Sequence, residues 1–458
     1  MRMADPPPTR LYIDPPINQW QVTPRNGRNI PVIATGHQPT LWHPGILAKY
    51  LAADVFAKHV NATTLNVIVE HNPLGPLAIE TPTQQGKKLS VQSLVFGDTS
   101  MAASLPPNRL PPIAAASVDR AIHGAGCLAV KAARDGLHRI AKAYEVQSDH
   151  PHRSAQSAAV LDQLKRPYLA EPMPTLATSD LVSQNFVDRL LADPVGCVRS
   201  YNRAALAYPD AGIRPLYHGR DVVEAPLWAQ GQAACTPVFI DLGDSKTPQF
   251  FTQGQSLDLN VSDVLVYLRP RAVTLSAIMR SEVCDLFIHG SGGGVYEQVT
   301  ERWWQDWVGE DLAPMAVVSA DMYLPFDVPT ATPAEHAKAQ WFAHHLPHNI
   351  DRYSEPIDVV DTALRNEKNE LLDRMNDDRN KRRRASAFKR IHAINAELAG
   401  RHQDALDQAR QRSADSRIGL CNAQITARRD WCFALYPQSQ LHALADQIKA
   451  SLTQTARR

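Results

Sequence analysis

The sequence predicts an α/β protein with a Rossmann-like parallel sheet core, helical insertions and a C-terminal antiparallel coiled-coil arm. Three observations indicate this fold. A strand, a helix and a second strand follow one another between residues 30 and 69. A glycine-rich turn joins a third strand to a helix between residues 285 and 304, and residues 357 to 399 contain neither glycine nor proline. The first two patterns favour parallel strands joined by helices, and the third favours long helices.

The first strand is predicted over residues 30 to 35, where the run IPVIAT is apolar and β-branched. After a proline-marked turn, apolar residues from Gly45 to Phe56 recur at helical spacing. A second β-branched run follows at residues 64 to 69. Strand, helix and strand within about forty residues form a βαβ unit, whose strands are parallel and whose crossover is right-handed.

Residues 285 to 304 read DLFIHGSGGGVYEQVTERWW. The apolar residues before the glycines predict a strand, and those after them predict a helix. Because glycine has no Cβ, such a turn lets backbone N–H groups approach a ligand, and the helix dipole favours an anion there. The alternative is a tight turn that needs glycine only for its backbone angles. The pattern matches neither the dinucleotide fingerprint nor the Walker loop.

Composition and spacing predict further elements along the chain. They are helices at residues 118–144 and 179–192, strands at 238–242, 264–268 and 316–319, an apolar run at 431–435 and a last helix at about 440–452. The predicted organisation is a Pro-rich arm that is extended over the surface or disordered (1–29), a first part of the core (30–100), a helical insertion (101–195), a second part of the core (196–350), the coiled-coil arm (351–418), and a strand and helix that return to the core (419–458).

Two apolar stripes at helical spacing predict the coiled-coil arm. The first consists of Leu364, Leu371 and Met375, and the second of Phe388, Ile391, Ile394 and Leu398. The charged segment 376–384 between them fits a hairpin turn, and Gly400 is the alternative position. The run from Lys381 to Arg384 fits a solvated hairpin tip better than a nucleic-acid patch, because the chain as a whole is nearly neutral.

The composition narrows the classes of partner. Lys and Arg number 48 and Asp and Glu 47 in 458 residues, so no overall charge favours nucleic acid or a membrane surface. We therefore expect a small-molecule substrate, and a homodimer through the arm. The six cysteines are far apart without a CxxC pair, which argues against zinc knuckles and disulfides. No run approaches the roughly 18 apolar residues of a spanning helix, and we expect a cytoplasmic protein.

Polar residues follow three predicted strands at their carboxyl ends, where the loops and helices of an open parallel sheet hold ligands. His37 and His289 are the candidate catalytic residues, because imidazole transfers protons near neutral pH. The candidate substrate-binding residues are Gly36, Gln38, His43, Glu70, His71, Asn72, Arg269, Arg271, Gly290, Ser291, Gly292, Gly293, Gly294, Tyr296 and Glu297. No metal is expected, because HExxH and other tight ligand spacings are missing.

Several of these residues have a second interpretation. A histidine after a strand is often only a hydrogen-bonded turn residue. Arg269 and Arg271 suit a carboxylate or phosphate, and they equally suit a solvated strand end. Glu297 suits an amine or a ribose hydroxyl, or it stabilises a helix N-terminus electrostatically.

Two blocks together resemble a known family, the bacillithiol biosynthesis cysteine-adding enzymes. Residues 268–299, LRPRAVTLSAIMRSEVCDLFIHGSGGGVYEQV, are similar to the family segment in which an RP pair precedes a helix, a strand and a Gly-rich GGP-x-E turn leading to a tyrosine. Residues 35–53, TGHQPTLWHPGILAKYLAA, resemble its TGQQ…GP…YK strand, turn and helix, and residues 434–444, ALYPQSQLHAL, resemble its lFP-x-gs-Lq ending. Order and spacing agree over most of the chain, whereas identity is confined to short blocks.

The resemblance implies a Rossmann-like core related to class I synthetase nucleotide-binding domains, a coiled-coil arm used for dimerisation, and a ligase that adds cysteine to the amino group of glucosaminyl-malate. Two departures lie at the implied site. His37 and Gln38 stand at the family's QQ, and His289, Gly290 and Ser291 stand at its GGP turn, whose proline and acidic residue are missing. These departures leave the substrate open.

The function expected from the sequence is that of a cysteine-ligase-like enzyme joining an amino acid to an amino-sugar acceptor, with ATP or another nucleotide as the candidate cofactor. One alternative is a nucleotidyltransferase, because the added histidines are slightly similar to the His-x-Gly-His element of such enzymes. The other is a non-catalytic metabolite-binding protein or a dimeric coiled-coil scaffold.

Overall fold

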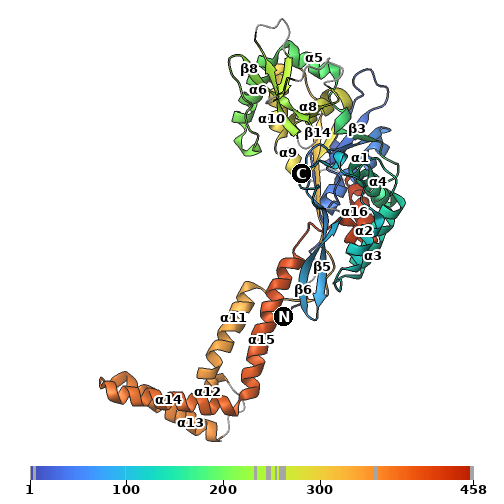
Figure 1. Ribbon diagram of the computed structural model, residues 1–458. Coiled ribbons are helices and arrows are strands. Elements are labelled where there is room, and N and C mark those ends of the chain that lie inside the picture. Colours follow the sequence, from blue (N-terminus) through green and yellow to red (C-terminus); the bar gives the residue numbers. More distant parts are fainter. Residues whose placement is uncertain are drawn as a thin grey trace. The chain divides into compact units, whose positions relative to one another are not determined.

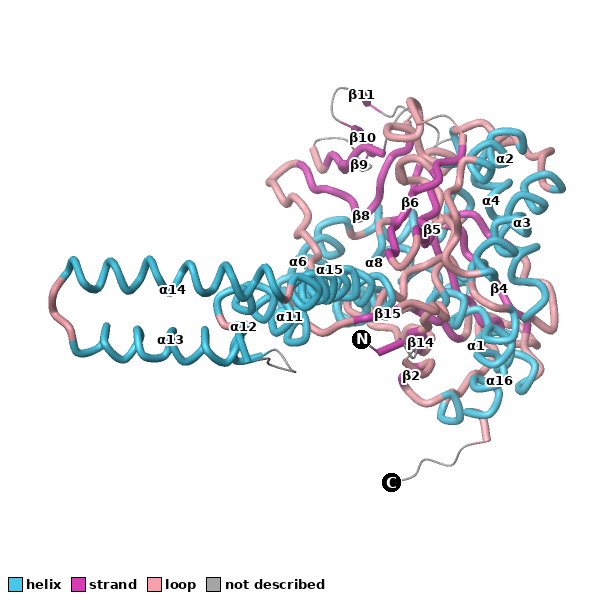
Figure 2. Tube along the Cα trace, turned by 90° about the horizontal axis from the view of Figure 1, so that it is seen from below, coloured by secondary structure: helices cyan, strands magenta, loops and turns pink. Residues whose placement is uncertain are grey.

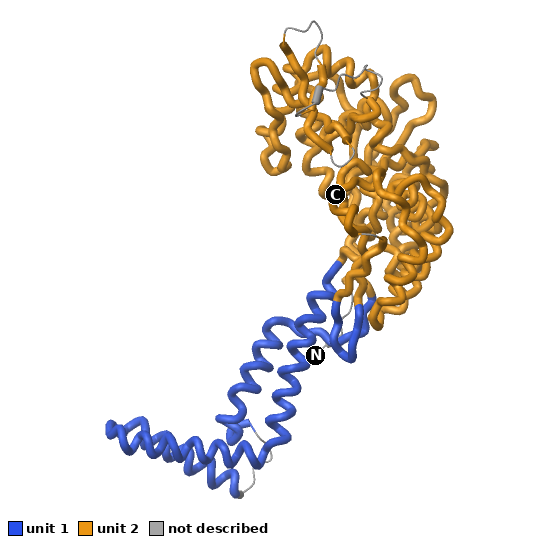
Figure 3. The backbone as a smooth tube through the Cα atoms, in the orientation of Figure 1, with its two compact units in different colours: residues 1–6, 83–90, 325–428 blue, residues 7–82, 91–324, 429–458 orange. Residues whose placement is uncertain are grey.

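The computed structural model describes residues 2–3, 7–97, 99–231, 235–243, 249–252, 255–256, 265–353 and 359–453. The chain divides into two compact units (Figure 3). Unit 1 comprises residues 1–6, 83–90 and 325–428, and unit 2 comprises residues 7–82, 91–324 and 429–458. Among the described helices, none combines the length and apolarity needed to cross a membrane.

A six-stranded sheet forms the centre of unit 2, with the strand order β2-β14-β13-β3-β4-β7 (Figure 1). Its strands are β2 (Arg10–Asp14), β3 (Val32–His37), β4 (Thr63–Ile68), β7 (Thr175–Ala177), β13 (Leu286–His289) and β14 (Met315–Asp321). All neighbours are parallel except β2, which runs antiparallel to β14. This arrangement confirms the predicted α/β class with a parallel sheet, and it places β13, β3 and β4 side by side.

The predicted βαβ unit consists of β3, helix α1 (Pro44–Val60) and β4. The middle of β3 is fully buried, as is typical of a strand covered on both faces. Helix α1 begins after His43, its N-cap, and ends at Asn61, whose left-handed backbone stops the helix. It packs against β14 and against α16 (Gln438–Ser451).

Two edge strands of this sheet lie where the sequence predicts none. Residues 10–14, predicted as part of a surface or disordered arm, pair with β14 as β2. Residues 175–177, inside the predicted helical insertion, pair with β4 as β7. Segments of three to five residues are too short to show a periodic apolar pattern, so their pairing is decided by tertiary contacts.

A second, antiparallel sheet in unit 2 has the order β11-β10-β9-β8-β12. Its strands are β8 (Val222–Gln230), β9 (Cys235–Asp241), β10 (Gln249–Thr252), β11 (Gln255–Ser256) and β12 (Leu268–Pro270). The strand predicted at 264–268 is misplaced. Val264 lies outside the described residues, and residues 265–267 form a turn in which Val266 and Tyr267 are exposed. The apolar residues 265–267 therefore do not form a buried strand.

Helices cover much of the rest of unit 2. They are α2 (Ala115–His123), α3 (Lys131–Val146), α4 (Arg153–Lys165), α5 (Gln184–Ala192), α6 (Pro194–Ala207), α8 (Ala272–Ile278), α9 (Ser291–Gly294) and α10 (Glu297–Trp307). The single helix predicted at 118–144 is wrong, because α2 ends at its C-cap Gly124 and α3 starts only at Lys131. The strand predicted near the C-terminus is also wrong, since residues 433–435 form a buried 3-10 turn before α16.

Unit 1 is mainly helical. Its elements include β1 (Arg2–Met3), β15 (Pro329–Thr330), α11 (Pro333–His345), α12 (Ile350–Tyr353), α13 (Val359–Asp377), α14 (Lys381–Arg401) and α15 (Gln403–Thr426). Helices α13 and α14 lie side by side, and the chain reverses between them at residues 378–380 (Figure 2). The turn therefore lies in the charged segment, and the alternative position near Gly400 holds a second break, at His402, before α15. A two-stranded sheet of β5 (Leu77–Gln85) and β6 (Lys88–Phe96) contributes its turn, residues 83–90, to unit 1.

One buried carboxylate, Asp285, fixes the entry to both central strands of unit 2. Its Oδ2 accepts a hydrogen bond from the N–H of Val32 at the start of β3 (2.8 Å). Its Oδ1 accepts from the N–H of Arg25 (2.8 Å) and from the guanidinium of Arg28 (2.9 Å). The carboxylate is 1% exposed, so these partners replace its hydration.

Asp285→Asn should therefore destabilise unit 2 by about 2 to 4 kcal/mol, because it removes the charge opposite Arg28 and turns one acceptor into a donor that faces N–H groups. Glu310→Gln is the matched control, since Glu310 is exposed and meets Arg189 at 3.5 Å. We expect that control to change stability by less than about 1 kcal/mol in denaturant titrations. Equal effects of the two substitutions would show that Asp285 has no special structural role.

Candidate functional site

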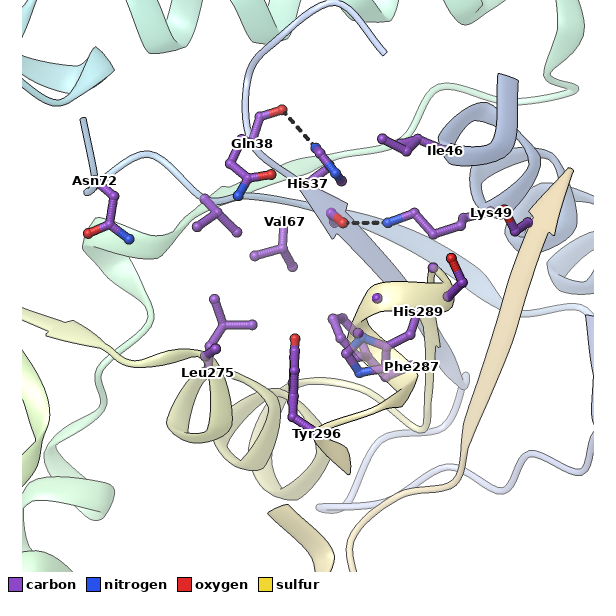
Figure 4. Close-up of a pocket in the computed structure, with 18 of the residues that line it drawn as sticks. His37, Gln38, Ile46, Lys49, Val67, Asn72, Leu275, Phe287, His289 and Tyr296 are labelled. Carbon is purple, nitrogen blue, oxygen red and sulfur yellow. Dashed lines mark hydrogen bonds between the residues drawn. The ribbon is translucent and has the colours of Figure 1, made fainter. Parts of the chain in front are cut away.

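A cavity of about 410 Å³ lies at the carboxyl ends of β13, β3 and β4 (Figure 4). Residues from β8, β14, α1, α8 and the glycine-rich turn complete it. Its lining comprises Gly36, His37, Gln38, His43, Gly45, Ile46, Lys49, Val67, Val69, His71, Asn72, Trp228, Pro270, Ala272, Leu275, Phe287, His289, Gly290, Ser291, Gly292, Gly293, Tyr296 and Ser319. The structure thus brings twelve of the seventeen predicted site residues to one cavity, and both predicted catalytic histidines are among them.

Lys49 is the charged side chain that distinguishes this cavity. It projects from α1, is 3% exposed, and donates a hydrogen bond from Nζ to the carbonyl oxygen of Gly36 (2.7 Å; Figure 4). No carboxylate in the described part of the chain forms an ion pair with it. Burial lowers the pKa of Lys49 to about 7. The ammonium therefore lacks the anionic partner that a buried cation normally has.

Three histidines around Lys49 are held in the neutral form. Burial, followed by the charge of Lys49, lowers the pKa of His37 to about 3. Burial, followed by the charge of Arg269, lowers the pKa of His71 to about 4. Burial also lowers the pKa of His43, whose Nδ1 accepts the N–H of Gly45 (3.1 Å) as a helix cap. At neutral pH these imidazoles add hydrogen-bonding groups to the cavity and no charge.

The glycine-rich turn presents backbone donors to the same cavity. The N–H groups of Gly293 and Gly294 donate to the carbonyl of Gly290 (3.0 and 3.2 Å). Those of Ser291 and Gly292, at the start of α9, have no acceptor among the residues that the structure describes. Lys49 lies next to this turn, because a Cβ on Gly290 would be 3.6 Å from its Cδ.

The glycines of the turn differ in the physical reason for which a side chain is absent. A Cβ on Gly293 would lie 2.3 Å from Nδ1 of His289, and a Cβ on Gly294 would lie 2.6 Å from Cγ2 of Val317, so packing excludes both. Gly292 has no positive φ, and a Cβ on it would meet no atom within 4 Å, yet it lines the cavity. Neither packing nor backbone angle explains a glycine there, whereas close approach of a ligand would.

His289 is oriented by a buried polar cluster behind the cavity wall. Its Nε2 lies 3.0 Å from Oε1 of Glu297, which also accepts a hydrogen bond from Ser276 (2.5 Å). Glu297 forms an ion pair with Arg280 through its other oxygen. Burial alone would raise the pKa of Glu297, but the hydrogen bond from His289 and the charge of Arg280 outweigh burial and lower it.

This cluster sets the tautomer of His289. Because Glu297 is held as a carboxylate, it accepts a hydrogen bond from the N–H at Nε2 and leaves Nδ1 as the basic nitrogen. Nδ1 lies on the side of Gly293, and it has no hydrogen-bond partner among the described residues. The arrangement can take a proton from a group bound in the cavity.

Five predicted binding residues do not line the cavity. Glu297 is fully buried behind His289, and Gly294 packs on Val317. Arg271 pairs with Glu224 (2.7 Å) and stacks on Trp228 (3.9 Å to the ring centroid), so it is already neutralised. Arg269 donates to Gln230 (2.7 Å), and Glu70 accepts from Ser179 (2.8 Å). Both arginines are buried, so the solvated strand-end interpretation is wrong, and neither of them lines the cavity.

The most informative lining residue that sequence reasoning missed is Lys49. It lies inside an otherwise apolar helical stripe, and its charge is a signal that could have been noticed there, since lysine is seldom buried. Trp228 and Ser319 carry no local signal, because β8 and β14 bring them to the cavity from distant parts of the chain.

Comparisons with known proteins add little to this geometry. No model of a protein family matches the chain, and no curated protein matches it. One solved structure similar to it is a tyrosyl-tRNA synthetase complexed with L-tyrosine from Archaeoglobus fulgidus, at 9% identity and a TM-score of 0.23, covering 84% of this chain and 91% of that one. A likeness this low carries no argument about function.

The buried ammonium makes a prediction about pH. The ordinary pKa of lysine is 10.5, and the folded value for Lys49 is about 7, so between these two pH values the unfolded chain binds more protons. Folding free energy therefore becomes more favourable as pH rises through this window. Lys49→Met should be more stable than the wild type at pH 7, and the difference should shrink by about 1 to 2 kcal/mol between pH 7 and 9.

Urea titrations of both proteins at pH 7, 8 and 9 measure this difference. Lys58→Met is the matched control, because Lys58 is exposed on the same helix. A Lys49→Met difference that stays constant over this range would show that Lys49 is not buried as a cation.

Proposed function

We propose that this chain is an enzyme that binds a small substrate through an anionic group, a phosphate or a carboxylate, in the cavity between β3 and the glycine-rich turn. Lys49 and the N–H groups of Ser291 and Gly292 hold the anion. His289, oriented by Glu297, takes up a proton from the reacting group. The observation that carries the proposal is the buried ammonium of Lys49, which faces the cavity without a carboxylate partner among the described residues.

The energetics support an anionic ligand over a neutral one. A buried charge without a counter-ion is unfavourable by several kcal/mol, and a bound anion offsets that penalty. The neutral histidines and the N–H groups of Ser291 and Gly292 add donors without adding competing negative charge. The carboxylate nearest to His289, that of Glu297, is neutralised by Arg280 and does not line the cavity.

The cavity volume and lining suit a small metabolite. About 410 Å³ is within the range of small-molecule sites, and apolar side chains including Leu275, Phe287 and Val67 enclose the remainder of the space. In Figure 4 the hydroxyl of Tyr296 points into the centre of the cavity, opposite His37. A ligand with an anionic end and a less polar body fits these surroundings.

Within this class, the reaction that we propose is amide-bond formation of the cysteine-ligase type. As the amine nitrogen bonds to the activated carboxyl carbon, the bond from that carbon to the activating phosphate or nucleotide oxygen breaks and this group leaves with the electron pair. The amine loses a proton in the same reaction, and Nδ1 of His289 is the available base. The resemblance of residues 35–53 and 268–299 to the bacillithiol biosynthesis cysteine-adding enzymes supports an amino-sugar acceptor. A nucleoside triphosphate would activate the carboxylate, and the donors around Lys49 fit its phosphates.

Further parts of the proposal rest on the same resemblance. They are a Rossmann-like classification of the core and homodimerisation through a coiled-coil arm formed by α13 and α14. The proposed cytoplasmic location rests instead on the six scattered cysteines. A nucleotidyl-transfer reaction is the alternative chemistry, since the same donors suit a phosphate.

A ligand screen tests the anion site. We expect ATP, citrate or pyrophosphate to raise the melting temperature of the wild type, since a ligand at a hundred times its dissociation constant adds about 2.7 kcal/mol. Lys49→Met should abolish the stabilisation, whereas Lys58→Met should keep it. Absence of any stabilisation by the anions, together with stabilisation by neutral amino sugars alone, would contradict the proposal.

The substitution Gly292→Ala tests whether the turn binds a ligand or needs glycine only for its backbone conformation. Alanine is favoured over glycine in a helix by roughly 0.5 to 1 kcal/mol, and the added methyl group meets no atom of the chain. We expect unchanged or slightly raised stability, with at least tenfold weaker binding of whichever anion the screen identifies. Unchanged affinity in calorimetry would show that the ligand does not approach this residue.

A further inference from the structure

A second charged surface, unrelated to the cavity, lies at the joined ends of α13 and α14 in unit 1. Residues 371 to 392 contain eight Lys or Arg and three Asp. We call the eight cations the basic tip: Arg374, Arg379, Lys381, Arg382, Arg383, Arg384, Lys389 and Arg390. All eight are exposed. The whole chain is nearly neutral, so its net charge does not reveal this local excess of positive charge. For that reason the sequence favoured a solvated hairpin tip here.

Intramolecular ion pairs account for only part of this charge. Arg390 forms a bidentate pair with Glu367 (2.6 and 2.7 Å), Arg374 meets Glu370 (3.3 Å), and Arg383 lies 3.9 Å from Asp378. Within the described residues no ion pair involves the other five, which are Arg379, Lys381, Arg382, Arg384 and Lys389. A solvated helix face usually mixes the two signs, whereas residues 379 to 396 contain no carboxylate.

The helices also leave apolar and aromatic surface uncovered beside these cations. Nearer the core of unit 1, Ile391, Ile394 and Leu398 are buried, but toward the tip Leu371, Leu372 and Met375 are only half-buried. A groove of about 820 Å³ lies between the helices there. Its lining comprises Leu371, Arg374, Met375, Asp377, Asp378, Arg383, Arg384, Ser386, Ala387 and Arg390, so arginines outnumber carboxylates in it by four to two. Phe388 is 56% exposed, and its ring lies 4.3 Å from that of His392.

We infer that the basic tip binds single-stranded nucleic acid. Six of the eight cations are arginines, whose planar guanidinium groups match phosphate oxygens in bidentate fashion. Phe388 offers a ring on which a base can stack between the cations, and the groove between the helices, with four arginines in its lining, can receive a second base. An acidic peptide would satisfy the charges, but it would make no use of an exposed ring beside them. The inference does not depend on the proposed function, because all of these residues belong to unit 1.

Fluorescence anisotropy of a labelled, mixed-sequence 20-nucleotide RNA with the full chain tests the inference. Binding should weaken steeply between 50 and 200 mM salt, since each phosphate contact to a single strand contributes about 0.7 to the slope of log K against log salt. Arg382→Gln with Arg384→Gln should lower the affinity at least tenfold at 50 mM salt and reduce that slope by about 1.4. Phe388→Ala should weaken binding about tenfold through lost stacking.

Arg412→Gln with Arg417→Gln is the matched control, because both residues are exposed on α15 of the same unit and the charge change is equal. It should alter affinity less than twofold, and circular dichroism should show unchanged helix content in every variant. No RNA binding at 50 mM salt, or an equal loss in the control, would overturn the inference. Displacement of RNA by polyglutamate of equal charge, with no effect of Phe388→Ala, would instead assign the tip to an acidic protein.

Discussion

The parallel pairing of β13 with β3 is the constraint on which the candidate site depends. These strands are about 250 residues apart in sequence, and their register sets Phe287 beside Ala34 and Ile288 beside Thr35. Two side-chain contacts lock that register, one from Asp285 to the start of β3 and one from the hydroxyl of Thr35 to the carbonyl of Ile288 (2.8 Å). Both strands end at the same edge, so the turn after each must share one space. The residues following β3 and those following β13 therefore form a single cavity.

Lys49 lies where these two turns meet. Its amine binds the carbonyl of Gly36 at the end of β3, and its aliphatic stem passes Gly290 after β13. The pairing of the strands thus places a buried cation in the wall of the cavity. The same burial that lowers its pKa also keeps His37 and His71 neutral, so positive charge in the cavity is concentrated on one amine. An anionic ligand is the partner that best compensates such a charge.

Sequence reasoning identified the strands at the site because each is a short apolar run followed by polar residues, and parallel order brings their ends together. It could not assign the roles of Arg269 and Arg271. In the sequence, an arginine at a solvated strand end cannot be distinguished from a buried one. Here the antiparallel pairing of β12 with β8 brings Arg271 to Glu224 and Arg269 to Gln230. Lys49 was missed because a lysine among apolar helix residues normally extends its charged end to solvent, whereas here the whole side chain is buried.

The helical regions show the same limit. Gly124 and Gly126 gave a visible reason to divide the helix predicted at 118–144, and the structure ends α2 there. The charged segment 376–384 correctly suggested a chain reversal, because it lacks apolar residues that a partner helix could cover. Strand β7 gave no signal, since three residues cannot show a period.

The central claim is that the cavity is an anion site built from both turns. Anomalous diffraction from crystals soaked in selenate at near-physiological ionic strength tests it most directly, because selenium locates the ion without prior assumptions. The account predicts a peak within hydrogen-bonding distance of Nζ of Lys49 and of the N–H groups of Ser291 and Gly292, and no such peak in Lys49→Met crystals. Selenate bound only elsewhere, with the bond from Lys49 to Gly36 unchanged, would contradict it.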